Sequence, residues 1–203
     1  MRVSLASFLS TAADTTSQTN DRWTLTPLHL ASQGGNEYVI VQTDSGSTPS
    51  HLASQGGHKG VARLLLEHSA DVTAQTNDGL TPLRQASEQG HEEFIPLLPG
   101  YGADATARAN DGSTPLHLAS KRGRGRVVHL LLEHNADATA KTNDGSTPLH
   151  FASRKVFEEV VLSLLEHGAD PTAETTDGLT PLFLGLEWGR EAVTYTSRAL
   201  QLG

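Results

Sequence analysis

The chain has 203 residues, of which 36% are hydrophobic and 19% are charged, so its composition is that of a globular protein and not of a disordered tail. Fifteen lysines and arginines stand against 23 aspartates and glutamates, and the resulting formal net charge of -8 at pH 7 argues against a protein that coats nucleic acid over its whole surface. The absence of cysteine excludes disulfides, thiol nucleophiles and cysteine-ligated metal sites, and it fits an intracellular protein, cytoplasmic or nuclear. No apolar run approaches the roughly 18 residues that a membrane-spanning helix needs.

The dipeptide Thr-Pro recurs along the chain at a regular interval. Its prolines are Pro27, Pro49, Pro82, Pro115, Pro148 and Pro181, so the interval is 22 residues once and then 33 residues four times. The surrounding text repeats as well, because residues 112–120 return almost unchanged at 145–153 and residues 131–137 return at 164–170. The chain is therefore built from 33-residue units, and a period of that length indicates a stack of similar structural units.

Each unit predicts two short helices followed by a turn. In the best-preserved unit, Thr114 is a good N-cap and Pro115 suits the first helical position, so a first helix is expected from Pro115 to Lys121. A second helix carries its apolar residues on one stripe, at 127, 128, 131 and 132, and ends before Asn135. The sequence Asn-Asp-Gly at 143–145 then predicts a tight, hairpin-like turn. Two helices and a turn cannot bury an apolar stripe alone, so the units must stack to form a core.

The N-terminal 41 residues are the least regular part of the array. Met1 to Leu9 loosely imitates a secretory signal, but the apolar stretch is only seven residues long and contains two serines, so we reject that interpretation. Residues 8–21 align instead with residues 65–78, and the 22-residue interval places a deletion after Val41 that removes most of a second helix. We therefore expect residues 1–41 to be degenerate, truncated repeat material and residues 42–203 to form one continuous repeat domain.

Three later departures from the pattern predict strain, a break or an end of the stack. Pro96 and Pro99 fall within a second helix, where an interior proline costs about 3 kcal/mol, so that helix should be short or broken. Val156 replaces the glycine expected between two helices, which strains the turn if its backbone needs a positive φ. Polar residues at 196–198 replace three leucines of an earlier unit, as the outer face of a C-terminal cap requires.

The Thr-Pro-Leu-His opening, the glycine between the helices, the Leu-Leu run and the Gly-Ala-Asp exit together resemble the ankyrin repeat, from about residue 8 to residue 193. The resemblance implies an all-α solenoid of stacked helix-turn-helix units joined by β-hairpin-like fingers. It also implies that the fingers and the first helices line a concave face that binds partner proteins. We accordingly expect a monomeric interaction scaffold that is not an enzyme and holds no cofactor.

Histidines and aspartates are the candidates for chemistry, and both have structural explanations. Four of the ten histidines, at 29, 51, 117 and 150, lie three residues after the capping threonine of their units, whereas a catalytic residue is needed only once. In ankyrin repeats this imidazole bonds the threonine and nearby backbone. The histidines at 68, 134 and 167 close second helices, and no third ligand recurs beside them, so no metal site is expected. The aspartates at 78, 111, 144 and 177 lie in turns where nothing would raise their pKa.

The distribution of charge indicates a binding site. Residues 108–155 carry eight basic and four acidic side chains, so this block has a charge of +4 in a chain of net charge -8. Carried over from the ankyrin resemblance, the positions that contact a partner are the finger tips and the ends of the first helices. In this block they are Arg108, Asn110, Asp111, Ser113, Lys121, Arg122, Lys141, Asn143, Asp144, Ser146, Arg154 and Lys155.

These positions predict protein binding through the concave face, with an acidic surface on the partner. Two alternatives stay open. The basic block 108–155 could bind nucleic acid or another polyanion, although an aromatic content of 5% argues against the stacking of single-stranded bases. Charges at helix ends are also often ordinary solvated surface, in which case the block has no binding role.

Overall fold

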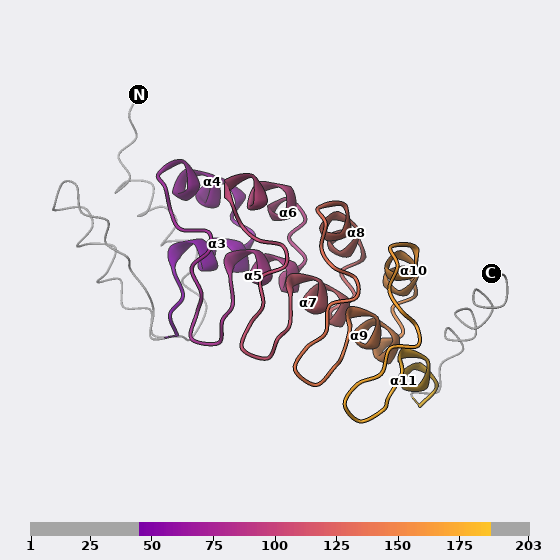
Figure 1. Cartoon of the computed structure of the whole chain (residues 1–203). Helices are drawn as coiled ribbons and strands as arrows, with labels where there is room; N and C mark the ends of the chain where they lie inside the picture. The colour runs from indigo at the N-terminus through magenta and orange to yellow at the C-terminus, as the bar shows by residue number, and fades with distance from the viewer. Residues whose placement is uncertain (1–44, 188–203) are drawn as a thin grey trace. The chain divides into compact units, whose positions relative to one another are not determined.

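The computed structural model describes residues 45–187, and these residues form stacked pairs of helices. The first helices of successive units are α3 (Pro49–Gly56), α5 (Pro82–Gln89), α7 (Pro115–Lys121), α9 (Pro148–Lys155) and α11 (Pro181–Glu187). The second helices are α4 (Lys59–Glu67), α6 (Phe94–Leu97), α8 (Gly125–Glu133) and α10 (Glu158–Glu166). Figure 1 shows the first helices packed in one row and the second helices in another, with the joining loops projecting beyond the first row.

No strand occurs within residues 45–187, so the prediction of an all-α repeat stack is confirmed for this part of the chain. The expectations for residues 1–41, for His29 and for a polar cap at 196–198 lie outside the described residues.

The first helices begin as the sequence predicts. In α7, Thr114 is an N-cap with an extended backbone, Pro115 is the first helical residue and the helix runs to Lys121. His117 completes a capping box, because its Nδ1 accepts a hydrogen bond from the backbone N–H of Thr114 at 3.1 Å. The tautomer is therefore the one that carries its proton on Nε2, which lies 3.2 Å from the carbonyl oxygen of Ser146 in the next unit.

The same two contacts recur at His51 and His150, whose Nε2 atoms face the carbonyl oxygens of Leu80 and Leu179. Burial lowers the pKa of all three imidazoles, and it lowers the pKa of His117 to about 4. Each neutral ring thus links the start of a first helix to the following finger through hydrogen bonds. The structural interpretation of these histidines is confirmed.

The second helices contribute apolar side chains to the core, and a left-handed residue follows the cap of α8. The stripe predicted for α8 is buried at Val127, Val128, Leu131 and Leu132. His134 closes that helix by placing Nδ1 2.9 Å from the carbonyl oxygen of Leu130, and Asn135 follows with φ 62°. Asparagine tolerates this conformation better than most residues, so the predicted end of the second helix is confirmed.

The turn between the two helices of a unit requires a positive φ. Gly123 has φ +67°, and a Cβ added there would lie 2.7 Å from the ring of Phe157, the N-cap residue of the second helix in the next unit. Val156 occupies the equivalent position in the following unit with φ 58° and ψ 44°. A β-branched residue in the left-handed region is an outlier, so the predicted strain at Val156 is confirmed.

The two prolines divide a second helix, as expected. α6 is only four residues long and is followed by a 3-10 turn, η1, at Pro99–Tyr101. Pro96 is the third residue of α6 and Pro99 is the first residue of η1, so each proline lies in a first turn, where its missing N–H removes no intrahelical bond. Phe94, Ile95 and Leu98 stay buried, which keeps the core filled despite the break.

Candidate protein-binding surface

The loop that joins each unit to the next is a finger with a tight turn at its tip. At 142–146, the backbone N–H of Gly145 donates to the carbonyl oxygen of Thr142 at 3.0 Å, and the N–H of Thr142 donates to the carbonyl oxygen of Ser146 at 2.9 Å. Gly145 has φ +80°, which this turn needs. The Thr142 hydroxyl and the Ser146 N–H both donate to Asp144 and hold its pKa below the usual value. The tip therefore presents an ionised carboxylate.

Neighbouring fingers are bonded to one another through asparagines spaced by one period. The backbone N–H of Asn143 donates to the carbonyl oxygen of Asp111 at 3.0 Å. Its side-chain Nδ2 donates to the carbonyl oxygen of Asn110 at 2.9 Å, and Asn110 donates in the same way to Asn77 at 3.0 Å. Asn110 and Asn143 are exposed, as a binding role requires, but their amide nitrogens also fix the spacing of the tips.

Arg84 replaces the capping-box histidine in its unit and extends into the next finger. Its side chain is only 1% exposed, its Nη1 donates to the carbonyl oxygen of Gly79 at 3.2 Å, and its Nη2 donates to the Ser113 hydroxyl at 2.7 Å. That hydroxyl donates to Asp111 at 2.5 Å. Burial opposes the charge of Asp111, but the Ser113 hydrogen bonds and the charge of Arg84 together keep its pKa below the usual value.

Two of the predicted contact residues point into the protein. Ser113 is 3% exposed and Ser146 is 8% exposed, and both help to hold the aspartate of their own finger. They position the finger tips and offer a partner almost no surface.

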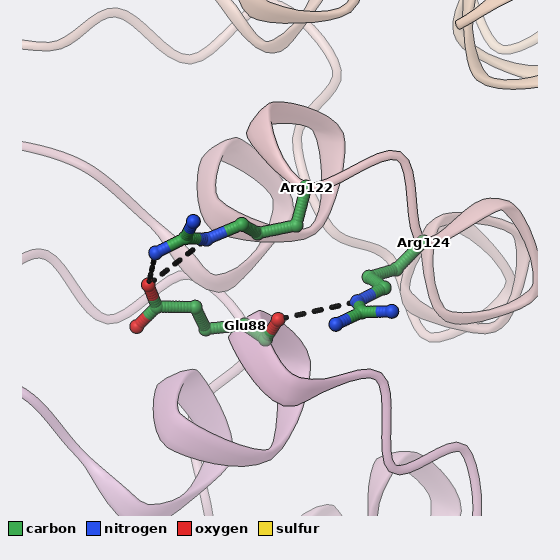
Figure 2. A network of polar contacts seen from close by, with 3 residues as sticks. All are labelled: Glu88, Arg122 and Arg124. Carbon is green, nitrogen blue, oxygen red and sulfur yellow. Dashed lines mark hydrogen bonds and ion pairs between the residues drawn. The ribbon is translucent and has the colours of Figure 1, made fainter.

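Three arginines of the basic block form hydrogen bonds or ion pairs with the preceding unit. Figure 2 shows Arg122 on the carboxylate of Glu88, with Nη2–Oε1 at 2.6 Å and Nε–Oε1 at 3.1 Å, and Arg124 on the Glu88 carbonyl oxygen at 3.3 Å. Arg126 lies 3.7 Å from the carboxylate of Glu92. Exposed ion pairs of this kind contribute about 0.2–1 kcal/mol each. Arg122, a predicted contact residue, is therefore partly neutralised within the fold.

These contacts between units were not predicted from the sequence, although the sequence contains a signal for them. Glu88 and Arg122 are 34 residues apart, and so are Glu92 and Arg126, which is one period plus one residue. Opposite charges at that separation lie side by side in a stack of 33-residue units. The replacement of His by Arg84 in its Thr-Pro-Leu-His opening was the equivalent signal for the buried guanidinium.

Three of the five other basic residues of the block lie at the C-terminal ends of two first helices. Lys121 ends α7, and Arg154 and Lys155 end α9; all three are exposed, and we refer to them as the basic helix-end cluster. The Lys121 ammonium lies 5.9 Å from the centre of the Phe151 ring, which is on α9. The end of α7 thus lies beside α9, and the three cations belong to two adjacent units.

The fingers beside this cluster are balanced in charge. Arg108 and Lys141 are exposed, but the exposed Asp111 and Asp144 lie on the same two fingers. The guanidinium of Arg108 also donates to the carbonyl oxygen of Lys141 in the next finger. Net positive charge among the predicted contact residues is therefore found at the helix ends and not at the finger tips.

The described residues offer no assembled metal site and no membrane span. Within residues 45–187, no group of three histidine, aspartate or glutamate side chains is placed to hold a metal ion. No helix in that range combines the length and the apolar character needed to cross a bilayer.

Comparison with known families identifies the repeat. A family model described as ankyrin repeats (3 copies) matches residues 3–76, 38–109 and 97–175. These overlapping matches run from residue 3 to residue 175, which is well over half of the 203 residues. A comparison with curated proteins gave no match.

Proposed function

The chain belongs to the ankyrin repeat family, and we propose that it is a non-catalytic module that binds an acidic surface of a partner protein on the face lined by its first helices and fingers. Ankyrin repeats in general mediate interactions between proteins. The observation that carries the finer proposal is the basic helix-end cluster, whose three exposed cations belong to two adjacent units of a chain with net charge -8.

The placement of charge supports an acidic partner. Among residues 45–187, no carboxylate lies within ion-pair distance of Lys121 or Lys155. Both cations can therefore accept a partner carboxylate without first losing one that belongs to residues 45–187. Such complementary charge mainly raises the rate of encounter and selects the partner.

Nucleic acid is the competing ligand for the same cations. Asp111 and Asp144 are ionised at the tips of the two adjoining fingers, and they would repel a phosphate backbone that runs past these tips. A protein partner can place its own donors at those two carboxylates. Binding to nucleic acid would also fall steeply with salt, because each neutralised phosphate releases a counterion.

The proposal is tested by reversing the charge of the cluster. Lys121→Glu with Arg154→Glu should abolish capture of partner proteins by the immobilised chain while leaving helicity unchanged. The matched control is Lys59→Glu with Arg63→Glu, because both residues are exposed on α4 and the change in net charge is the same. The control should retain the partners. Equal capture by the two double variants would place the binding site elsewhere.

A further inference from the structure

The basic helix-end cluster lies beside an apolar side chain. Phe151 is half-buried on α9, with its ring held on one side by the edge-to-face ring of His117, whose centroid is 5.9 Å away. The Lys121 ammonium lies 5.9 Å from the ring centre. Both of these neighbours belong to α7, and part of Phe151 stays open to solvent.

Phe151 shares a helix face with two of the three cations. Arg154 and Lys155 follow it at the i+3 and i+4 positions of α9, so all three project from the same side. On α7, the half-buried Leu118 has the same relation to Lys121. The surface between α7 and α9 is therefore a small apolar area bordered by positive charge.

Neither a purely acidic nor a purely apolar ligand fits this surface well. A purely acidic segment would pair the cations and leave the apolar area without a contact. A neutral apolar segment would cover Phe151 but would partly desolvate the cations without pairing them, which is unfavourable. A segment that alternates carboxylates with a large apolar side chain satisfies both requirements.

We propose that the protein recognises an acidic segment of its partner that carries an aromatic or large aliphatic side chain between carboxylates, and that Phe151 receives this side chain. The inference rests on the proposed function, because it names the partner chemistry for the same surface. The carboxylates pair with Lys121, Arg154 and Lys155, and the apolar side chain packs on the open part of the Phe151 ring.

Three labelled heptapeptides test this inference by fluorescence anisotropy against the full chain. One has a central phenylalanine among glutamates, the second has a central alanine among glutamates, and the third has the phenylalanine among glutamines. The first peptide should bind about threefold to tenfold more tightly than the second, which is the range expected for one aromatic contact. The third should bind least, because it cannot pair with the cations.

The Phe151 variants link the preference to this residue. With Phe151→Ala, the phenylalanine and alanine peptides should bind alike, and Phe151→Leu should restore part of the preference. Leu162→Ala is the matched control, because Leu162 is an apolar side chain 53% exposed on α10, outside this surface. It should leave the preference unchanged.

The peptide measurements distinguish a failure of this inference from a failure of the proposed function. If both acidic peptides bind equally in the wild type, the role of Phe151 is overturned while the acidic partner of the proposed function stands. If neither acidic peptide binds, both proposals are overturned. If a thymidine oligonucleotide binds as tightly as the phenylalanine peptide and depends equally on Phe151, the surface is a nucleic-acid site and the inference is wrong.

Discussion

Position 156 gives the most direct test of the backbone geometry, through a comparison of Val156→Gly with Val156→Ala. The residue has φ 58° and ψ 44°, and the preceding units hold Gly57, Gly90 and Gly123 at the equivalent turn, all with positive φ. Alanine retains the Cβ that this conformation disfavours, whereas glycine removes it. Both variants lose the valine methyl groups, so the difference between them reports the backbone alone.

The magnitude follows from two opposing effects. A left-handed conformation costs a residue with a Cβ about 1–2 kcal/mol. Glycine loses about 0.5–1 kcal/mol more conformational entropy than alanine on folding. The glycine variant should therefore be more stable than the alanine variant by up to about 1.5 kcal/mol, which is the reverse of the order found inside a helix.

Urea unfolding followed by circular dichroism measures this difference. The control pair is Arg63→Gly and Arg63→Ala, because Arg63 is exposed in the interior of α4. At that site, glycine should be the less stable variant by about 1 kcal/mol. If glycine is also the less stable variant at position 156, the turn is not left-handed in solution and the strain assigned to Val156 is refuted.

Three further predictions concern pH, the broken helix and the ion pair. Acidification from pH 6.5 to pH 4 should lower the free energy of unfolding by up to about 3 kcal/mol through His117. In the unfolded chain this imidazole takes up a proton near pH 6.5, whereas burial lowers its pKa in the folded protein to about 4. His117→Gln should reduce that slope in urea titrations, and an unchanged slope would exclude this histidine as its source. Amide hydrogen exchange should be faster across α6 and η1 than across α8, because α6 has only four residues and α8 has nine. Pro96→Arg with Pro99→Leu, the residues of the preceding unit, should lengthen the broken helix, narrow the difference in exchange rate and raise the free energy of unfolding. Equal exchange rates in the wild type would contradict the expectation that the broken helix is less stable than α8. Glu88→Gln should strengthen binding of the glutamate–phenylalanine peptide by about twofold to fivefold, because it frees Arg122, and unchanged affinity would place Arg122 outside the site.

Local signals explain how much of the fold the sequence could predict. The threonine cap and Pro115 define the start of α7, Asn135 marks the end of a second helix, and Val156 stands where other units have glycine. Each signal acts within a few residues and is repeated in sibling units. A comparison of equivalent positions in different units therefore distinguishes a real departure from the repeat pattern from chance variation in sequence.

The candidate site was harder to predict because its contacts depend on long side chains that cross between units. Arg84 donates a hydrogen bond to Ser113 in the next finger, and Glu88 forms an ion pair with Arg122. These contacts depend on side-chain conformation and on the packing of one unit against the next, which a reading of single units does not include. For the same reason, the turn sequence placed Ser146 at a finger tip without indicating that the residue is buried.

The surface between α7 and α9 is the proposed binding site for an acidic segment of the partner. The most direct measurement is a titration of the 15N-labelled full chain with the glutamate–phenylalanine peptide, followed by amide chemical shifts. We expect the largest shifts at 118–123 and 151–157, with the amides of α10 unaffected. Shifts centred on α8 and α10, or spread evenly over the described units, would contradict this expectation.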